Sequence, residues 1–291
     1  MAEPSFNRAD GRFVYGMTVL GLNAVAELTF AGANAVATPG GPDIVVRVER
    51  SDGQRRAVHA LDAHRSVESV GAAHQWVLER ASFSARLVGP PLDPDLLAHP
   101  CLAPVAVAFN RWAGRESFHA ASFAVGGRAY GVIGPRTAGK STLVAGLAAA
   151  GTTVLSDDIV ITDGRNAFAG PRCVDLRAPI PGLDISTVSA RLGTRWRLRL
   201  SPAPASLPLG GWIFLSWGDD VSIRRCPPRE VIARLTQWRG RRVLASDPTV
   251  VLDLVARPAW ELTRPRDWSR FDDVSQILTR TLDPRVSELS R

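Results

Sequence analysis

Cysteine is scarce in this chain, which has three cysteines in 291 residues. Cys101, Cys173 and Cys226 lie far apart and form no CxxC pair, so neither a zinc site nor a disulfide framework is indicated. The N-terminal residues lack the apolar core of a signal peptide, and no apolar run reaches the length that crosses a membrane. These absences predict a reduced, cytoplasmic setting and no membrane partner.

The chain also lacks any basic block with interleaved aromatic residues, a pattern typical of proteins that bind single-stranded nucleic acid. Its formal net charge is nevertheless +7, and arginine greatly outnumbers lysine. Such a charge suits nucleotide phosphates or an acidic peptide as well as nucleic acid. Because the aromatic pattern is missing, we do not expect a nucleic-acid partner.

Residues 134–141 (GPRTAGKS) carry the clearest chemistry, since they match G-x-x-x-x-G-K-[ST], the pattern of a phosphate-binding loop. The apolar residues 130–133 before them predict a buried strand. Residues 141–150 after them predict a helix that ends at Gly151. A strand, a glycine-rich loop and a helix therefore follow in the order that such a loop requires.

The chemistry of this segment, called the glycine loop below, follows from its composition. Its two glycines let the backbone turn tightly, so that successive N–H groups point at phosphate oxygens, and the helix start adds positive potential. Lys140 is expected to reach the β- and γ-phosphates and the Ser141 hydroxyl to complete a Mg²⁺ shell. The alternative is a glycine-rich turn without a ligand. The expected nucleotide contacts are Gly134, Pro135, Arg136, Thr137, Ala138, Gly139, Lys140, Ser141 and Thr142.

An acidic pair, Asp157 and Asp158, ends the next predicted strand, residues 152–155, which residues 159–161 are expected to continue. A carboxylate opposite a phosphate loop can hold the metal or accept a hydroxyl proton. We therefore count both carboxylates, with Ser141, as candidate metal ligands. The alternative is a solvated turn, because Asp-Asp is common at strand ends.

The order of these motifs resembles a known family. Ser117-x-His119, a predicted hairpin, the glycine loop, a helix and a strand ending in Asp-Asp are similar to the HPr kinase/phosphorylase group over about residues 117–177. The resemblance implies an α/β P-loop kinase core related to phosphoenolpyruvate carboxykinase. It also implies ATP and Mg²⁺ as ligands and phosphorylation of a serine in a protein.

Further roles come from the resemblance alone. It implies that Asp157 is the general base, that Asp158 assists the metal or orients its neighbours, and that His119 lies beside the acidic pair. A histidine buried in the core is the alternative for His119. The R-G-L-G signature linked to the reverse reaction is missing from residues 170–177 (GPRCVDLR), so we expect kinase activity and draw no phosphorylase activity from the resemblance.

Three other segments, residues 15–17, 42–48 and 258–265, resemble a divergent branch of this group that includes kinases tailoring ribosomally made peptides such as lasso peptides. The expected partner is then a peptide or protein with an acceptor serine. HPr kinases assemble as hexamers, so a homo-oligomer is also an expectation. A small-molecule kinase and a non-catalytic ATP-binding regulatory protein are the alternatives.

Arginine alternates with apolar residues at Arg195, Arg197 and Arg199, which would share one face of a strand. We expect one or two of these arginines, Arg195 and Arg197 first, to reach the transferring phosphate or an acidic acceptor. Arg172 and Arg177 are weaker candidates of the same kind. The alternative is a solvated edge strand.

The chain divides into two predicted units, a β-rich accessory domain over residues 1–112 and an ATP-binding catalytic domain over residues 113–291. The first unit ends in a helical stretch, residues 95–112, that Pro100 and Pro104 interrupt. The remaining expected elements are strands at 13–20, 43–48, 74–78, 82–88, 117–125 and 195–200, a hairpin of 212–217 with 221–223, and C-terminal helices at 228–238, 248–256 and 271–281.

Overall fold

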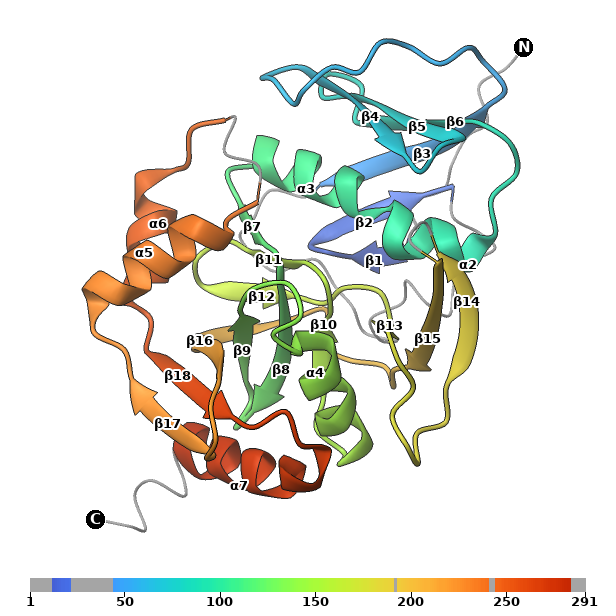
Figure 1. Cartoon of the computed structure of the whole chain (residues 1–291). Coiled ribbons are helices and arrows are strands. Elements are labelled where there is room, and N and C mark those ends of the chain that lie inside the picture. Colours follow the sequence, from blue (N-terminus) through green and yellow to red (C-terminus); the bar gives the residue numbers. More distant parts are fainter. Residues whose placement is uncertain (1–11, 22–43, 191–192, 241–243, 284–291) are drawn as a thin grey trace.

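The computed structural model describes residues 12–21, 44–190, 193–240 and 244–283. It is a mixed α/β fold with three β-sheets (Figure 1). The accessory unit contains a six-stranded sheet in the order β1-β2-β3-β6-β5-β4. Its strands are β1 (Arg12–Val14), β2 (Met17–Leu20), β3 (Val45–Ser51), β4 (Arg65–Val70), β5 (His74–Glu79) and β6 (Ser84–Val88).

The prediction of one strand over residues 13–20 is wrong, because this segment forms two short antiparallel strands, β1 and β2, joined by a turn. Tyr15 and Gly16 both have positive φ, at 55° and 76°, and join β1 to β2. This is the backbone geometry of the two-residue turns whose twist matches a hairpin. Tyr15 is fully buried, so tertiary packing holds a tyrosine where turn chemistry alone favours asparagine or glycine.

The helical stretch that follows is interrupted as predicted. It consists of α2 (Pro94–Leu96), a π-helical turn η3 (Leu97–Cys101) and α3 (Ala103–Trp112). The break falls at His99, which is extended, as expected for the residue before a proline. Pro104 lies in the first turn of α3, where a proline begins a helix without cost. The Trp76 indole donates to the carbonyl of Cys101 at 2.7 Å and ties β5 to this segment.

The core contains a nine-stranded sheet and a three-stranded sheet. In the large sheet the order is β10-β8-β9-β16-β12-β11-β7, with β18 beside β16 and β17 beside β18. The small sheet has the order β13-β15-β14. The strands are β7 (Glu116–Phe118), β8 (Ala120–Val125), β9 (Arg128–Ile133), β10 (Val154–Ser156), β11 (Val160–Thr162), β12 (Asn166–Phe168), β13 (Cys173–Leu176), β14 (Ser186–Ala190), β15 (Gly193–Arg199), β16 (Ser206–Trp217), β17 (Ser222–Arg225) and β18 (Ala259–Arg264).

Alternation along β9 separates the two faces of the large sheet. Tyr130 and Val132 join an apolar cluster with α4 (Lys140–Ala149) and α7 (Phe271–Leu282), whereas Ala129 and Ile133 join a second cluster with α3, α5 (Pro228–Trp238) and α6 (Pro248–Ala256). The second cluster also contains Trp76 of the accessory sheet, so the two predicted units share one apolar core. The boundary at residue 112 stays a prediction.

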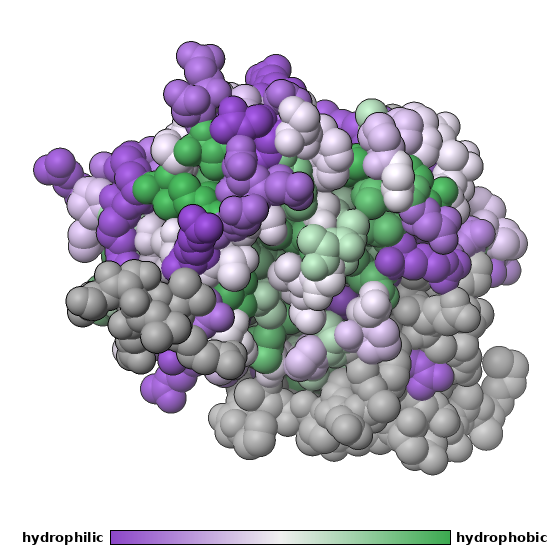
Figure 2. Space-filling model, turned by 90° about the horizontal axis from the view of Figure 1, so that it is seen from below, coloured by the Kyte–Doolittle hydropathy of each residue, from purple (hydrophilic) through white to green (hydrophobic). Residues whose placement is uncertain are grey.

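Helix α7 closes one end of the molecule, next to a 3₁₀ turn η4 (Trp268–Arg270). Figure 2 views this end, where apolar side chains gather in patches with hydrophilic side chains around them. Trp268 stacks on Phe271 with ring centroids 4.7 Å apart, and both rings lie against Gly146 of α4. None of the helices in the described part of the chain is both long and apolar enough to cross a membrane.

Three strand predictions fail where pairing is non-local. The strand over residues 117–125 breaks at His119 into β7 and β8, and residues 159–161 do not continue β10, because β11 pairs with β7 and β12. The hairpin of 212–217 with 221–223 is also wrong. β18 lies between β16 and β17, parallel to the former and antiparallel to the latter. β17 is largely exposed and carries two arginines, which suits the edge of a sheet, whereas β18 is apolar enough for the position between β16 and β17.

The three C-terminal helices are confirmed to within one residue.

Candidate active site

The glycine loop connects the end of β9 to the start of α4, as predicted. Gly134 is buried, and Pro135, Arg136 and Thr137 form an exposed crest. Thr137 has φ of 71°, which a β-branched residue rarely adopts, and such strained positions cluster at ligand-binding loops. Gly139 follows with φ of 78° and precedes the first helical residue.

The N–H groups at the helix start have no internal acceptor. Within the described ranges, no hydrogen bond satisfies the N–H of Gly139, Lys140 or Ser141. The first N–H groups of a helix need an external partner, and an anion is well suited because of the helix dipole. Thr142 lies in the same first turn of α4. This end of the helix can therefore hold a phosphate.

Lys140 is the only lysine of the chain. Its side chain is buried, and Nζ donates to the carbonyls of Gly134 at 2.9 Å and Pro135 at 3.3 Å. Burial lowers the pKa of Lys140, while the nearby Asp157 and Asp158 raise it and Arg177 lowers it. No carboxylate of the described residues forms an ion pair with this ammonium group. Its charge is therefore left for an anionic ligand.

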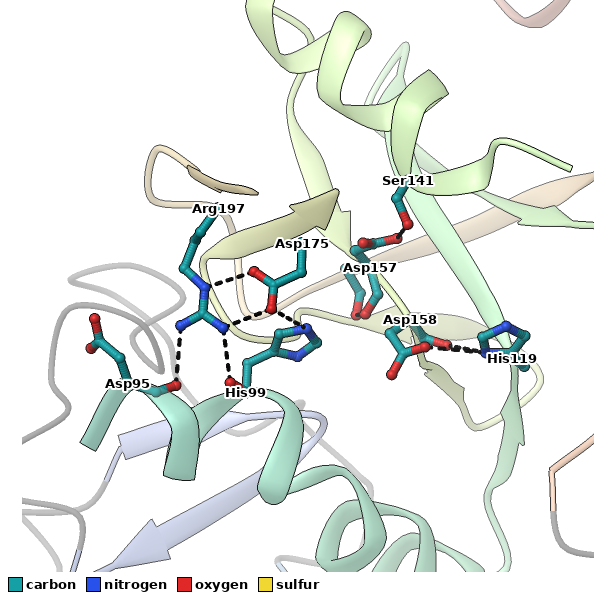
Figure 3. A network of polar contacts seen from close by, with 9 residues as sticks. Asp95, His99, His119, Ser141, Asp157, Asp158, Asp175 and Arg197 are labelled. Atoms are coloured by element: carbon teal, nitrogen blue, oxygen red, sulfur yellow. Dashed lines mark hydrogen bonds and ion pairs between the residues drawn. The ribbon is translucent and has the colours of Figure 1, made fainter. Parts of the chain in front are cut away.

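Asp157 and Ser141 meet beside the loop (Figure 3). Ser141 Oγ donates to Asp157 Oδ1 at 3.1 Å, and Asp157 is 4% exposed at the end of β10. Burial and then the charge of Asp158 raise the pKa of Asp157 to about 7, against the hydrogen bond from Ser141, which lowers it. The structure thus brings together a hydroxyl group and a carboxylate that can change its proton at neutral pH.

His119 and Asp158 form a second pair on the more exposed side. His119 Nδ1 lies 3.1 Å from the backbone oxygen of Asp158 and 3.2 Å from its Oδ1. The His119 side chain is 48% exposed, so the alternative of a histidine buried in the core is wrong. Burial raises the pKa of Asp158, but the His119 hydrogen bond and other positive groups outweigh it, and the pKa lies below its ordinary value. The pKa values of the two neighbouring carboxyl groups are thus shifted in opposite directions, upward for Asp157 and downward for Asp158.

Arg264 lies at the candidate site and was not predicted from the sequence. It ends β18, is 9% exposed, and donates through one nitrogen to the carbonyls of Ala138 at 2.9 Å and Gly139 at 3.1 Å. Its guanidinium lies over the ring of Trp217, 4.4 Å from the centroid. In the sequence, Arg264 lies near the end of residues 258–265, a partly apolar segment that contributed only to the family resemblance. Its position in that segment does not indicate a contact with the glycine loop.

The arginine strand is the central strand of the small sheet. β15 lies between β13 and β14, so the solvated edge strand is wrong. Arg197 is 1% exposed, donates to both oxygens of Asp175 at 2.7 and 2.8 Å, and also donates to the carbonyls of Asp95 and His99 (Figure 3). These contacts join the small sheet to α2 and η3.

Of the candidates Arg172 and Arg195, only Arg172 is buried with internal partners. Arg172 is buried and donates to the carbonyls of Val154, Leu155 and Ser201, and burial lowers its pKa to about 10. It therefore supports β10, the strand that carries Asp157. Arg195 is half-buried and donates to the carbonyl of Thr194. The structure brings together Lys140, Ser141, Asp157, Asp158 and His119, and gives Arg172 and Arg197 internal partners away from the loop.

A second group of metal-ligand side chains lies nearby, formed by His99, Cys173 and Asp175, whose ligand atoms all fall within 4.8 Å of one another. Burial lowers the pKa of His99 and raises that of Cys173. Both oxygens of Asp175 already accept from Arg197, which neutralises the charge that a cation needs. This group therefore fits a buried polar network better than a metal centre.

No family model matches the sequence, and no curated protein matches it. Among the solved structures that match is the HPr(Ser) kinase/phosphatase from Coxiella burnetii, at 9% identity and a TM-score of 0.32, over 57% of this chain and 95% of that one. The likeness is distant. The resemblance to peptide-tailoring kinases stays a prediction.

Proposed function

We propose that this chain is a kinase that transfers the γ-phosphoryl group of ATP, with Mg²⁺, to a hydroxyl group, namely a serine of a peptide or protein. The observation that carries the proposal is the 3.1 Å contact of Ser141 with Asp157 at a helix start whose N–H groups have no acceptor among the residues that the structure describes. Phosphoryl transfer needs positioning and charge neutralisation more than a covalent nucleophile, and these groups supply both.

The residues fit a magnesium ion. Mg²⁺ prefers oxygen ligands, and Ser141, Asp157 and Asp158 offer a hydroxyl and two carboxylates. The raised pKa of Asp157 also means that the protein leaves its buried negative charge under-compensated, as a cation site would require. When bound, Mg²⁺ would neutralise charge on the phosphate oxygens. The free N–H groups and Lys140 would hold the phosphates on the other side.

The same carboxylate suits proton transfer. A general base works best when its pKa is close to the operating pH, and the pKa of Asp157 is about 7. In the proposal Asp157 takes the proton of the acceptor hydroxyl, while His119 fixes the orientation of Asp158 through the contacts at 3.1 and 3.2 Å.

In this proposal, arginines other than Arg197 bind the acidic acceptor, because Arg197 is buried and paired with Asp175. Arg136 is exposed on the crest of the glycine loop. Arg177 is exposed and close enough to Lys140 to lower its pKa. Arg195 remains a candidate on the small sheet. Exposed guanidinium groups beside a phosphate site can bind carboxylates of a peptide.

The test is transfer of labelled γ-phosphate from ATP and Mg²⁺ to a panel of serine peptides and small alcohols, with Lys140→Ala and Asp157→Asn in parallel. Label on a peptide serine that both substitutions abolish supports the proposal. Label only on a small alcohol makes the chain a small-molecule kinase. ATP binding without transfer identifies an ATP-binding regulatory protein, and no ATP binding overturns nucleotide chemistry altogether.

A further inference from the structure

Arg264 contacts the glycine loop from behind. Its side chain comes from β18, far along the chain, and reaches the carbonyl oxygens of Ala138 and Gly139. The Gly139 oxygen also accepts from the N–H of Leu143 in α4 at 2.9 Å. A Cβ atom at Gly139 would lie 2.6 Å from the guanidinium, so this position must be glycine for Arg264 to sit where it does.

The two carbonyls belong to particular peptide units. The Ala138 carbonyl shares its peptide unit with the N–H of Gly139, and the Gly139 carbonyl shares its unit with the N–H of Lys140. In a trans peptide the C=O and N–H point in opposite directions. Arg264 therefore binds the rear of the two units whose N–H groups lack an acceptor, and hydrogen bonds in series polarise one another.

No described side chain neutralises the charge of Arg264. No carboxylate in the described segments pairs with it, its Nε has no hydrogen-bond partner, and the group is nine-tenths buried. Burial lowers its pKa to about 10, which leaves it charged at neutral pH. An unpaired buried cation is costly unless an anion compensates it, and the glycine loop is the adjacent place for one.

We infer that Arg264 is a positioning residue for nucleotide phosphate. It holds the glycine loop by the carbonyls of Ala138 and Gly139, strengthens the opposite N–H groups as donors, and has its own charge balanced when a di- or triphosphate binds. Trp217 keeps the guanidinium in place through its ring. The inference rests on the proposed nucleotide binding and assigns Arg264 to the phosphates.

Titration calorimetry on the full chain tests it with two probes, ATP with Mg²⁺ and inorganic pyrophosphate. Arg264→Met keeps an unbranched apolar stem but removes the charge and the guanidinium donors, so it should weaken the binding of both probes by a similar factor of roughly 10- to 100-fold. Arg264→Lys keeps the charge but not the planar fork, and should lie between wild type and Arg264→Met.

Arg115 is the matched control. It too is buried, donates to the Gly16 carbonyl and to Asn110 Oδ1, and lies over an aromatic ring, that of Phe168, at 4.5 Å. Arg115→Met should lower the melting temperature without changing the affinity for pyrophosphate. If Arg264→Met does not fold, the affinity of Arg264→Lys for the two probes tests the inference instead. If wild type binds both probes and the Arg264 variants bind them with the same affinity, the inference is overturned and the kinase proposal stands. If wild type binds neither probe, the kinase proposal itself is overturned.

Discussion

The guanidinium of Arg197 donates to both carboxylate oxygens of Asp175, at 2.7 and 2.8 Å, and the pair is buried where the small sheet meets the segment before α3. Removing one partner of a buried ion pair leaves an uncompensated charge, which costs about 3–5 kcal/mol. Arg197→Met should therefore lower the free energy of unfolding by about that amount in urea denaturation. The double variant with Asp175→Asn should recover part of the loss, and equal losses in the single and double variants would contradict this account.

Asp157 should make the ligand-free protein less stable as the pH rises. Its pKa is about 7 in the folded chain against 3.8 for an ordinary aspartate, so the folded state binds more protons between about pH 4 and pH 7. Stability falls across this window by at most about 1.4 kcal/mol per pH unit. Asp157→Asn should flatten the dependence and be more stable than wild type at pH 8, as followed by urea unfolding without Mg²⁺ or nucleotide. Parallel pH curves for the two proteins would refute it.

Nucleotide should stabilise the chain through the glycine loop. A ligand at 100 times its dissociation constant adds about 2.7 kcal/mol to the free energy of unfolding. We expect ATP with Mg²⁺ to raise the melting temperature of wild type and to have little effect on Lys140→Ala. A shift of equal size in both proteins would mean that ATP binds somewhere other than the loop.

Gly146 should tolerate no side chain, because a Cβ there would lie 2.4 Å from the ring of Phe271 and 2.7 Å from that of Trp268. Gly146→Val is expected to lower the free energy of unfolding by about 1–3 kcal/mol, the usual cost of overpacking. Ala149→Val, on an exposed position of the same helix, serves as the control in thermal denaturation. Valine has a higher helix propensity than glycine, so a gain in stability for Gly146→Val would mean that helix propensity, and not the docking of α7, sets the effect.

The sequence predicts features that depend on nearby residues. Strand, glycine loop and helix follow in the expected order, and the C-terminal helices begin at Pro228, Pro248 and Phe271 as predicted, because prolines and caps act within one turn. The acidic pair lies beside Ser141 for the same reason, since only one helix separates them.

Features set by distant residues could not be predicted. β17 finds its neighbour in β18 only after two helices have intervened, and the partner of Arg197 is fixed by the burial of β15 between two strands. Arg264 reaches a loop 125 residues away in sequence, and no local pattern indicates that contact. Periodicity identified which residues share a face of a strand, but not which protein surface covers that face.

Because Lys140 is the only lysine of the chain, reactions that select for lysine side chains have a single internal target. That target is buried against the carbonyls of Gly134 and Pro135 at the centre of the candidate site. An amine-reactive mass tag, or acetylation by an enzyme, would therefore change one peptide of the digest besides the N-terminus. The mass of that peptide reports directly on whether the Lys140 amine is accessible, without a substrate or a coupled assay.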